Sequence, residues 1–134
     1  MDWVLNLDKE LRELTWERSK GYCEACGKPM DYETWDWSHR LSKSHGGKYE
    51  VQNGMAVHHA CHLEEIENHP YLARQKGWRV ASQGNPAEVP ILLYGRKWVY
   101  LTTDGKYRLP IKGEKSVLDL IITKPYNSLQ KERE

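Results

Sequence analysis

Residues 39–62 read HRLSKSHGGKYEVQNGMAVHHACH, and this stretch decides the fold. It contains five of the six histidines of the chain, one of its three cysteines and a pair of adjacent glycines. Histidine exchanges protons near neutral pH and binds metal ions, and cysteine thiolate is a strong zinc ligand. So many side chains of this kind in one short segment predict a metal site or a catalytic site.

Two paired motifs supply the metal ligands. Cys23-x2-Cys26 lies in the turn YCEACGKPM at 22–30, and His58-x2-Cys61 closes the second half. Three thiolates and one imidazole match a tetrahedral zinc site, which outweighs the alternative of free buried cysteines and a surface histidine. His59 is a rival ligand, but the x2 spacing favours His58. A closed site leaves no position for water, so this zinc is expected to be structural.

Composition narrows the class of protein. The chain has 134 residues, a net charge of only +1 and no phenylalanine, which fits one soluble domain without a strongly basic surface. No apolar run reaches the length of a membrane span and no signal peptide is evident, so we expect a cytoplasmic protein. An odd number of cysteines, two of them in a CxxC motif, favours metal binding over disulfides.

The pattern of apolar residues and of glycine and proline predicts an α+β fold. The expected elements are helices at 7–20, 61–69 and 71–76, strands at 32–40 and 55–58 with an exposed loop at 41–51 between them, and a β-hairpin or three-stranded meander at 90–110. We divide the chain into a core at 1–80, a small β-meander extension packed on the core at 81–125, and a polar tail at 126–134.

The segments GYCEACG, SHRLSKSHGG, VQNGMAVHHACH and CHLEEIENHP occur in this order. In order and spacing they resemble the HNH endonucleases, the ββα-metal nuclease family, and in particular its small bacteriophage-type members. The resemblance extends from Gly21 to about Gly77. It implies a ββα-metal core with zinc knuckles, and a chain that comes from a phage genome and acts in the bacterial cytoplasm.

The resemblance also implies a function. It places His39 at the general base and His62 at the ligand of a catalytic divalent ion, which is Mg²⁺, Mn²⁺ or Ni²⁺. Asn53 takes the place of the asparagine of the motif, where it either holds the loop that orients His39 or reaches the metal. The implied activity is hydrolysis of DNA phosphodiester bonds by an endonuclease or nickase, which leaves 5′-phosphate ends.

One position departs from the family pattern. Many members carry Asp or His directly before the base, as a second ligand of the catalytic ion, whereas this chain has Ser38. A serine hydroxyl is a poor ligand for such a cation. The candidates that could replace it are Asp36, His45 and His69.

Basic residues beside the base are candidates for DNA contacts. Arg40, Lys43 and Lys48 could neutralise phosphates, and Arg40 is favoured because it adjoins His39, although each could be a solvated surface charge. The partners expected are DNA and a packaging protein such as a phage terminase. The alternative function is a zinc-stabilised nucleic-acid-binding or packaging-accessory module that does not cleave, and a purely structural zinc domain is the weakest of the three.

Overall fold

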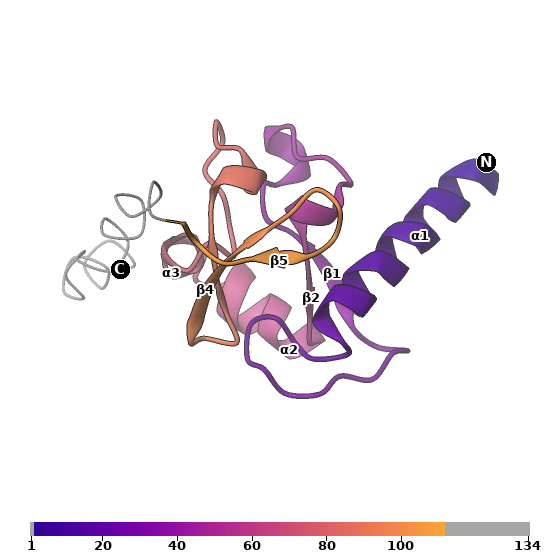
Figure 1. Ribbon diagram of the computed structural model, residues 1–134, viewed down its shortest axis with the longest axis horizontal. Coiled ribbons are helices and arrows are strands. Elements are labelled where there is room, and N and C mark those ends of the chain that lie inside the picture. The colour runs from indigo at the N-terminus through magenta and orange to yellow at the C-terminus, as the bar shows by residue number, and fades with distance from the viewer. Residues whose placement is uncertain (1, 112–134) are drawn as a thin grey trace.

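The computed structural model describes residues 2–111, with side chains described from Asp8 onward. The chain begins with the long helix α1 (Asp2–Ser19), whose first turns project from the body of the molecule (Figure 1). The helix ends where Lys20 and Gly21 take positive φ angles of 56° and 81°, a conformation that glycine adopts without strain. The helix expected at 7–20 is therefore confirmed, and it starts five residues earlier.

A tight turn follows α1. The backbone N–H of Cys23 donates to the Lys28 carbonyl at 2.9 Å, and the N–H of Gly27 donates to the Cys23 carbonyl at 2.8 Å. Gly27 has a φ of +82°, which this turn requires. These bonds hold Cys23 and Cys26 on the same turn of backbone.

Two short antiparallel strands form the first sheet. Strand β1 (Asp36–His39) pairs with β2 (Gly54–Val57), so that Asp36 lies opposite Val57 and His39 lies opposite Gly54. The connection between them is long and contains two 3₁₀ turns, η1 (Lys43–His45) and η2 (Val51–Asn53). The expected strands and loop are present, with strands shorter than the sequence pattern indicated.

A helical segment follows β2 directly. Helix α2 (His59–Cys61) runs into η3 (His62–Glu67), a π-helical stretch in which the Asn68 N–H donates to the Leu63 carbonyl at 3.0 Å. Helix α3 (Pro70–Gln75) begins after His69. The helix expected at 61–69 is present, but its widened turns change which side chains share a face. Strand, strand and helix together give the ββα order.

The rest of the described chain forms a second sheet. Residues Pro86–Glu88 form the short turn η4, and β3 (Ile91–Leu93), β4 (Lys97–Leu101) and β5 (Tyr107–Arg108) pair in that order, all antiparallel. The expected meander is confirmed. The end of the extension at 112–125 and the tail at 126–134 lie outside the described residues.

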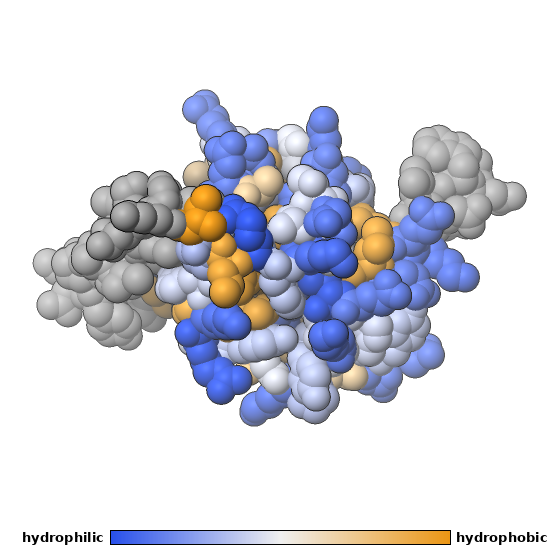
Figure 2. Space-filling model, in the orientation of Figure 1, coloured by the Kyte–Doolittle hydropathy of each residue, from blue (hydrophilic) through white to orange (hydrophobic). Residues whose placement is uncertain are grey.

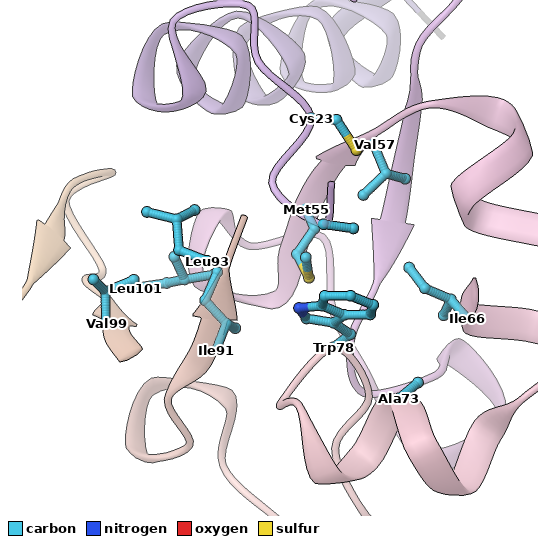
Figure 3. Close-up of a cluster of buried hydrophobic side chains, with 11 residues drawn as sticks. Cys23, Met55, Val57, Ile66, Ala73, Trp78, Ile91, Leu93, Val99 and Leu101 are labelled. Carbon is cyan, nitrogen blue, oxygen red and sulfur yellow. The ribbon is translucent and has the colours of Figure 1, made fainter. Parts of the chain in front are cut away.

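Both sheets share one hydrophobic core (Figure 3). Met55 and Val57 of β2 lie with Trp78 between the helical segment and the strands β3 and β4, and Cys23 lies at one end of the cluster. The remaining buried members are Ala25, Ile66, Ala73, Ile91, Leu93, Val99 and Leu101. The fold is thus α+β. The expected division of the chain at residue 80 stays a prediction, and the hydrophobic core includes residues from both sides of it.

The face drawn in Figure 2 is mostly hydrophilic, with apolar side chains in small patches. No helix within residues 2–111 combines the length and the apolar character that a bilayer span needs.

A buried ion pair links α1 to both sheets. The Arg18 guanidinium donates twice to the Glu24 carboxylate, with both contacts at 2.8 Å, and both side chains are fully buried. Arg18 also donates to the carbonyls of Val51 and Gly54, each at 2.7 Å, and the Tyr107 hydroxyl donates to Glu24 at 2.6 Å. Every partner comes from a different element, so this pair fixes how the elements meet.

We therefore expect Glu24→Gln to destabilise the protein by about 3–5 kcal/mol, because a neutral amide leaves the buried Arg18 charge uncompensated. Urea unfolding at neutral pH measures the change. Glu17→Gln, at an exposed position on α1, is the matched control and should change the free energy of unfolding by less than about 0.5 kcal/mol.

Candidate metal centre and catalytic site

Four side chains from two turns of the chain converge at one point. Cys23 and Cys26 come from the turn after α1, His58 from the residue before α2, and Cys61 from the end of α2. Their ligand atoms all lie within 4.8 Å of one another, with the His58 Nδ1 at 3.4 Å from Cys26 Sγ and 3.9 Å from Cys61 Sγ. Sulfur atoms around a tetrahedral zinc ion are about 3.8 Å apart. The set can hold a metal ion.

Surrounding bonds orient this cluster. His58 Nε2 lies 2.9 Å from the Pro29 carbonyl, to which it donates, and this leaves Nδ1 free of its proton and facing the thiols. The backbone N–H groups of Cys26 and His58 each point at Cys23 Sγ from 3.4 Å. Burial raises the pKa of the Cys23 and Cys61 thiols, and the neighbouring thiols raise that of Cys61 further. A bound cation is what would favour the thiolate forms.

His39, the expected base, stands at the end of β1 between two aromatic rings. Its ring centroid is 4.9 Å from that of Trp37 and 4.7 Å from that of Tyr49, edge to face in both cases. Its Nε2 is buried and has no hydrogen-bond partner among the described residues. Burial, then the charge of Lys43, then that of His62 lower the pKa of His39 below its ordinary value. The ring is therefore neutral at pH 7.

A carboxylate joins the expected metal ligand on the helix to the start of β1. Asp36 Oδ2 lies 2.9 Å from His62 Nδ1 and 2.8 Å from His59 Nδ1. Burial alone raises the pKa of Asp36, but the hydrogen bonds from His62 and His59 outweigh it, so the pKa lies below its ordinary value. Of Asp36, His45 and His69, only Asp36 bonds His62 within the described part of the chain.

Ser38 does not lie where a cation ligand is needed. It is 1% exposed, opposite Met55 in the hairpin, and its hydroxyl has no hydrogen-bond partner among residues 8–111. A hydrated ion cannot reach a hydroxyl buried in this way without opening the hairpin. This burial argues against Ser38 as a ligand of the catalytic ion, as the weak ligand character of a serine hydroxyl already indicated.

Asn53 holds the loop between the strands. Its Oδ1 accepts from the Leu41 N–H at 2.8 Å, and its Nδ2 donates to the carbonyls of Leu41 and Lys48 at 3.1 Å and 3.0 Å. The side chain is 1% exposed. Of the two roles left open from the sequence, this geometry matches the one in which Asn53 fixes the loop beside His39, not direct contact with a metal.

The expectation that Arg40 contacts DNA phosphate is wrong. The side chain is 1% exposed and donates to four backbone carbonyls at 2.6–2.9 Å: those of Gln52, Gly77, Pro86 and Val89. Burial lowers the pKa of Arg40 to about 9. The Arg40 side chain lies in the interior, where it links the hairpin loop to the segment before β3.

The two lysines remain on the surface. Lys43 is exposed in η1, with its Nζ 5.8 Å from the centre of the Tyr49 ring, and Lys48 is exposed three residues after His45. His45 contacts Ser42 Oγ from its Nδ1 at 3.1 Å. His69 is the residue that precedes α3. Lys43 and Lys48 thus keep the exposure that a phosphate contact requires.

Tyr49 was missed from the sequence, and His59 was considered there only as a rival ligand of the zinc. Tyr49 stacks on Trp37 with ring centroids 5.6 Å apart and borders His39, and His59 bonds Asp36 instead of joining the thiols. The alternation of side chains along a strand could have placed Trp37 beside His39. No sequence signal indicated Tyr49, because it lies in a loop without periodicity.

Replacing Lys43 should raise the pKa of His39, because one of the two positive charges that oppose its protonation is removed. We expect the pKa of the His39 ring, followed by NMR titration, to be higher in Lys43→Gln than in wild type, where it lies below the ordinary value of histidine. As the pH falls, His39 would therefore become protonated at a higher pH in the variant than in wild type. An unchanged or lower value in the variant would contradict the assignment of Lys43 as a cause.

One comparison with known protein families agrees with this geometry. The family model described as HNH endonuclease matches residues 23–66, from the first cysteine of the metal cluster to the last but one residue of η3. No curated protein and no solved structure matches the chain. The match spans the turn, the ββ hairpin and the helical segment that carry the metal cluster, His39 and His62. Residues 23–66 therefore match the HNH endonuclease family.

Proposed function

We propose that this protein is a metal-dependent endonuclease or nickase that hydrolyses DNA phosphodiester bonds. The observation that carries the proposal is the position of His39 at the end of β1, where Trp37 and Tyr49 hold its ring and its Nε2 is buried. Burial and the charges of Lys43 and His62 lower the pKa of this ring, which favours its neutral form. The HNH match supports the reaction class.

In this proposal His39 takes a proton from the attacking water. Because its Nε2 is buried, the proton is accepted at Nδ1, and the packing of Trp37 and Tyr49 against the ring limits its rotation. Asn53 keeps the neighbouring loop in place through its bonds to Leu41 and Lys48. His62 would hold a divalent cation, and such an ion would supply charge stabilisation for the scissile phosphate and the departing 3′ oxygen.

Zinc is the ion proposed for Cys23, Cys26, His58 and Cys61, because a donor set of three sulfurs and one imidazole nitrogen favours it. All four ligands come from the chain, so this ion acts on the fold and not on the substrate. Mg²⁺, Mn²⁺ or Ni²⁺ is proposed for the separate cation at His62.

The proposed test is plasmid cleavage by the zinc-loaded protein. Supercoiled plasmid should be converted to the nicked circle or the linear form when Mg²⁺, Mn²⁺ or Ni²⁺ is added, and not in EDTA used briefly enough to leave the zinc in place. Ligation of the nicks without prior phosphorylation checks for 5′-phosphate and 3′-hydroxyl ends. Absence of cleavage with every one of these ions would refute the proposal.

Lys43 and Lys48 are proposed to neutralise phosphates. Each substitution, Lys43→Ala or Lys48→Ala, should reduce the slope of log K against log salt concentration by about 1, as expected for the loss of one phosphate contact. Fluorescence anisotropy with a labelled duplex between low and moderate salt measures the slope. Lys9→Ala, which removes an exposed charge on α1, should leave it unchanged.

A second candidate is a zinc-stabilised nucleic-acid-binding or packaging-accessory module that does not cleave DNA. The burial of Ser38, where family members carry an acidic or histidine ligand, favours it. It predicts salt-dependent DNA binding without cleavage in the plasmid assay. A phage origin, a cytoplasmic site of action and a phage terminase as partner belong to either proposal.

A further inference from the structure

The acidic group that a catalytic cation needs is absent from position 38 but present two residues earlier. Successive side chains of a strand alternate between its faces, so Asp36 and Ser38 share one face of β1. Ser38 is buried there, whereas the Asp36 side chain is 27% exposed, as is that of His62. Only the earlier position can therefore be reached by a hydrated ion.

We infer that Asp36 and His62 together bind the divalent cation of this domain, with Asp36 supplying the carboxylate that Ser38 cannot. The inference deepens the proposed function. It rests on that function only for the role of the ion in DNA cleavage. Cation binding itself can be measured without DNA.

The distance between the two groups supports shared ligation. Asp36 Oδ2 and His62 Nδ1 are 2.9 Å apart. Adjacent ligands of an octahedral ion with bonds of about 2.1 Å are about 3 Å apart. The two atoms need little movement to bind one ion, and the remaining positions are left for water and a phosphate oxygen. His62 Nδ1 gives up its proton when it binds the ion.

His59 reaches the same carboxylate from the solvent side. Its side chain is 67% exposed, and its Nδ1 donates to Asp36 Oδ2 at 2.8 Å. A hydrogen bond to a ligating carboxylate holds its orientation. The adjacent histidines of the motif thus divide between two sites, because His58 faces the thiols and His59 faces Asp36.

The test measures Mn²⁺ binding to the zinc-loaded protein by the EPR signal of free Mn²⁺. We expect wild type to bind one Mn²⁺ and Asp36→Asn to bind it at least about 10-fold more weakly. Asp31→Asn, at an exposed aspartate, and Ser38→Ala should bind as wild type does. A wild-type affinity in Asp36→Asn, or a loss in Ser38→Ala with its zinc content and fold intact, would overturn the inference.

A spectroscopic measurement separates a ligand from a residue that only orients His62. In protein grown with carboxylate-¹³C aspartate, electron–nuclear double resonance of bound Mn²⁺ should show a ¹³C coupling that disappears in Asp36→Asn. A ¹⁴N coupling from imidazole should disappear in His62→Ala. If Mn²⁺ binds with the nitrogen coupling but no ¹³C coupling, Asp36 is not a ligand and the inference fails.

The inference and the proposed function fail in different ways. A protein that binds Mn²⁺ through Asp36 and His62 but never cleaves plasmid keeps the inference and loses the nuclease. A protein that cleaves plasmid while Asp36→Asn binds Mn²⁺ as well as wild type keeps the nuclease and loses the inference. Failure of the wild type to bind Mn²⁺ at millimolar concentration also refutes the inference.

Discussion

His39→Ala is expected to lower the rate of plasmid nicking by about 10²–10⁴-fold, the usual contribution of a positioned general base. The reason is that no other titratable ring takes its place between Trp37 and Tyr49 at the end of β1. The rate is measured under single-turnover conditions at saturating cation. Zinc content and the thermal transition should stay close to those of wild type, because His39 contacts none of the thiol ligands.

Two further measurements exclude a merely structural effect. Added imidazole should restore part of the activity of His39→Ala, since the cavity left by the ring opens next to the water it would activate, and should not affect His62→Ala. His45→Ala is the matched control from the same loop, where an exposed histidine contacts only Ser42, and it should retain the wild-type rate. Equal losses in His39→Ala and His45→Ala would count against His39 as the base.

Removal of the ion at the thiol cluster is expected to unfold the domain. Structural zinc contributes about 10–16 kcal/mol to small zinc domains, which equals or exceeds the whole stability of a typical domain of about 5–15 kcal/mol. The cluster joins the turn after α1 to the start of α2, and Cys23 is also a buried member of the core. Without the ion, three thiols would be left crowded together at this junction.

Zinc stoichiometry by elemental analysis, followed by circular dichroism during slow chelation, tests this expectation. Cys61→Ala should fail to retain zinc and lose the cooperative thermal transition. His59→Ala should keep one zinc ion per chain, because the ring of His59 points to Asp36 and not to the cluster. A chelated protein that keeps its cooperative unfolding would show that the cluster is dispensable for the fold.

Local spacing was enough to predict the metal cluster. A CxxC turn and an HxxC turn each place two ligands on one stretch of backbone. The cluster then forms as soon as the fold brings these two turns together. The long helix α1 and the meander were also visible, because their apolar periodicity and turn residues act over a few positions. The HNH order connected the two halves of the cluster through the hairpin and the helical segment, and the family match over residues 23–66 agrees with that part of the order.

The sequence did not indicate in the same way which single side chains point into the interior and which point to solvent. Arg40 follows His39 directly and looks like a surface charge, yet its guanidinium has four carbonyl partners, three of them from segments after residue 76. No local pattern reveals carbonyls that arrive from 37 to 49 residues away. The partners of Asn53, Leu41 and Lys48, are only 12 and 5 residues away, but these contacts exist only after the hairpin has formed.

By itself, therefore, the sequence determined which four residues form the cluster that can hold a metal ion. It also determined which strand and helix carry the two histidines of the motif, since both follow from spacing along the chain. Only the tertiary structure decided that Ser38 and Arg40 are buried and that Asp36 meets His62 and His59. The physical reason is that burial and contacts between distant segments depend on how β1 packs against the helical segment and the second sheet, and no single stretch of sequence encodes that packing.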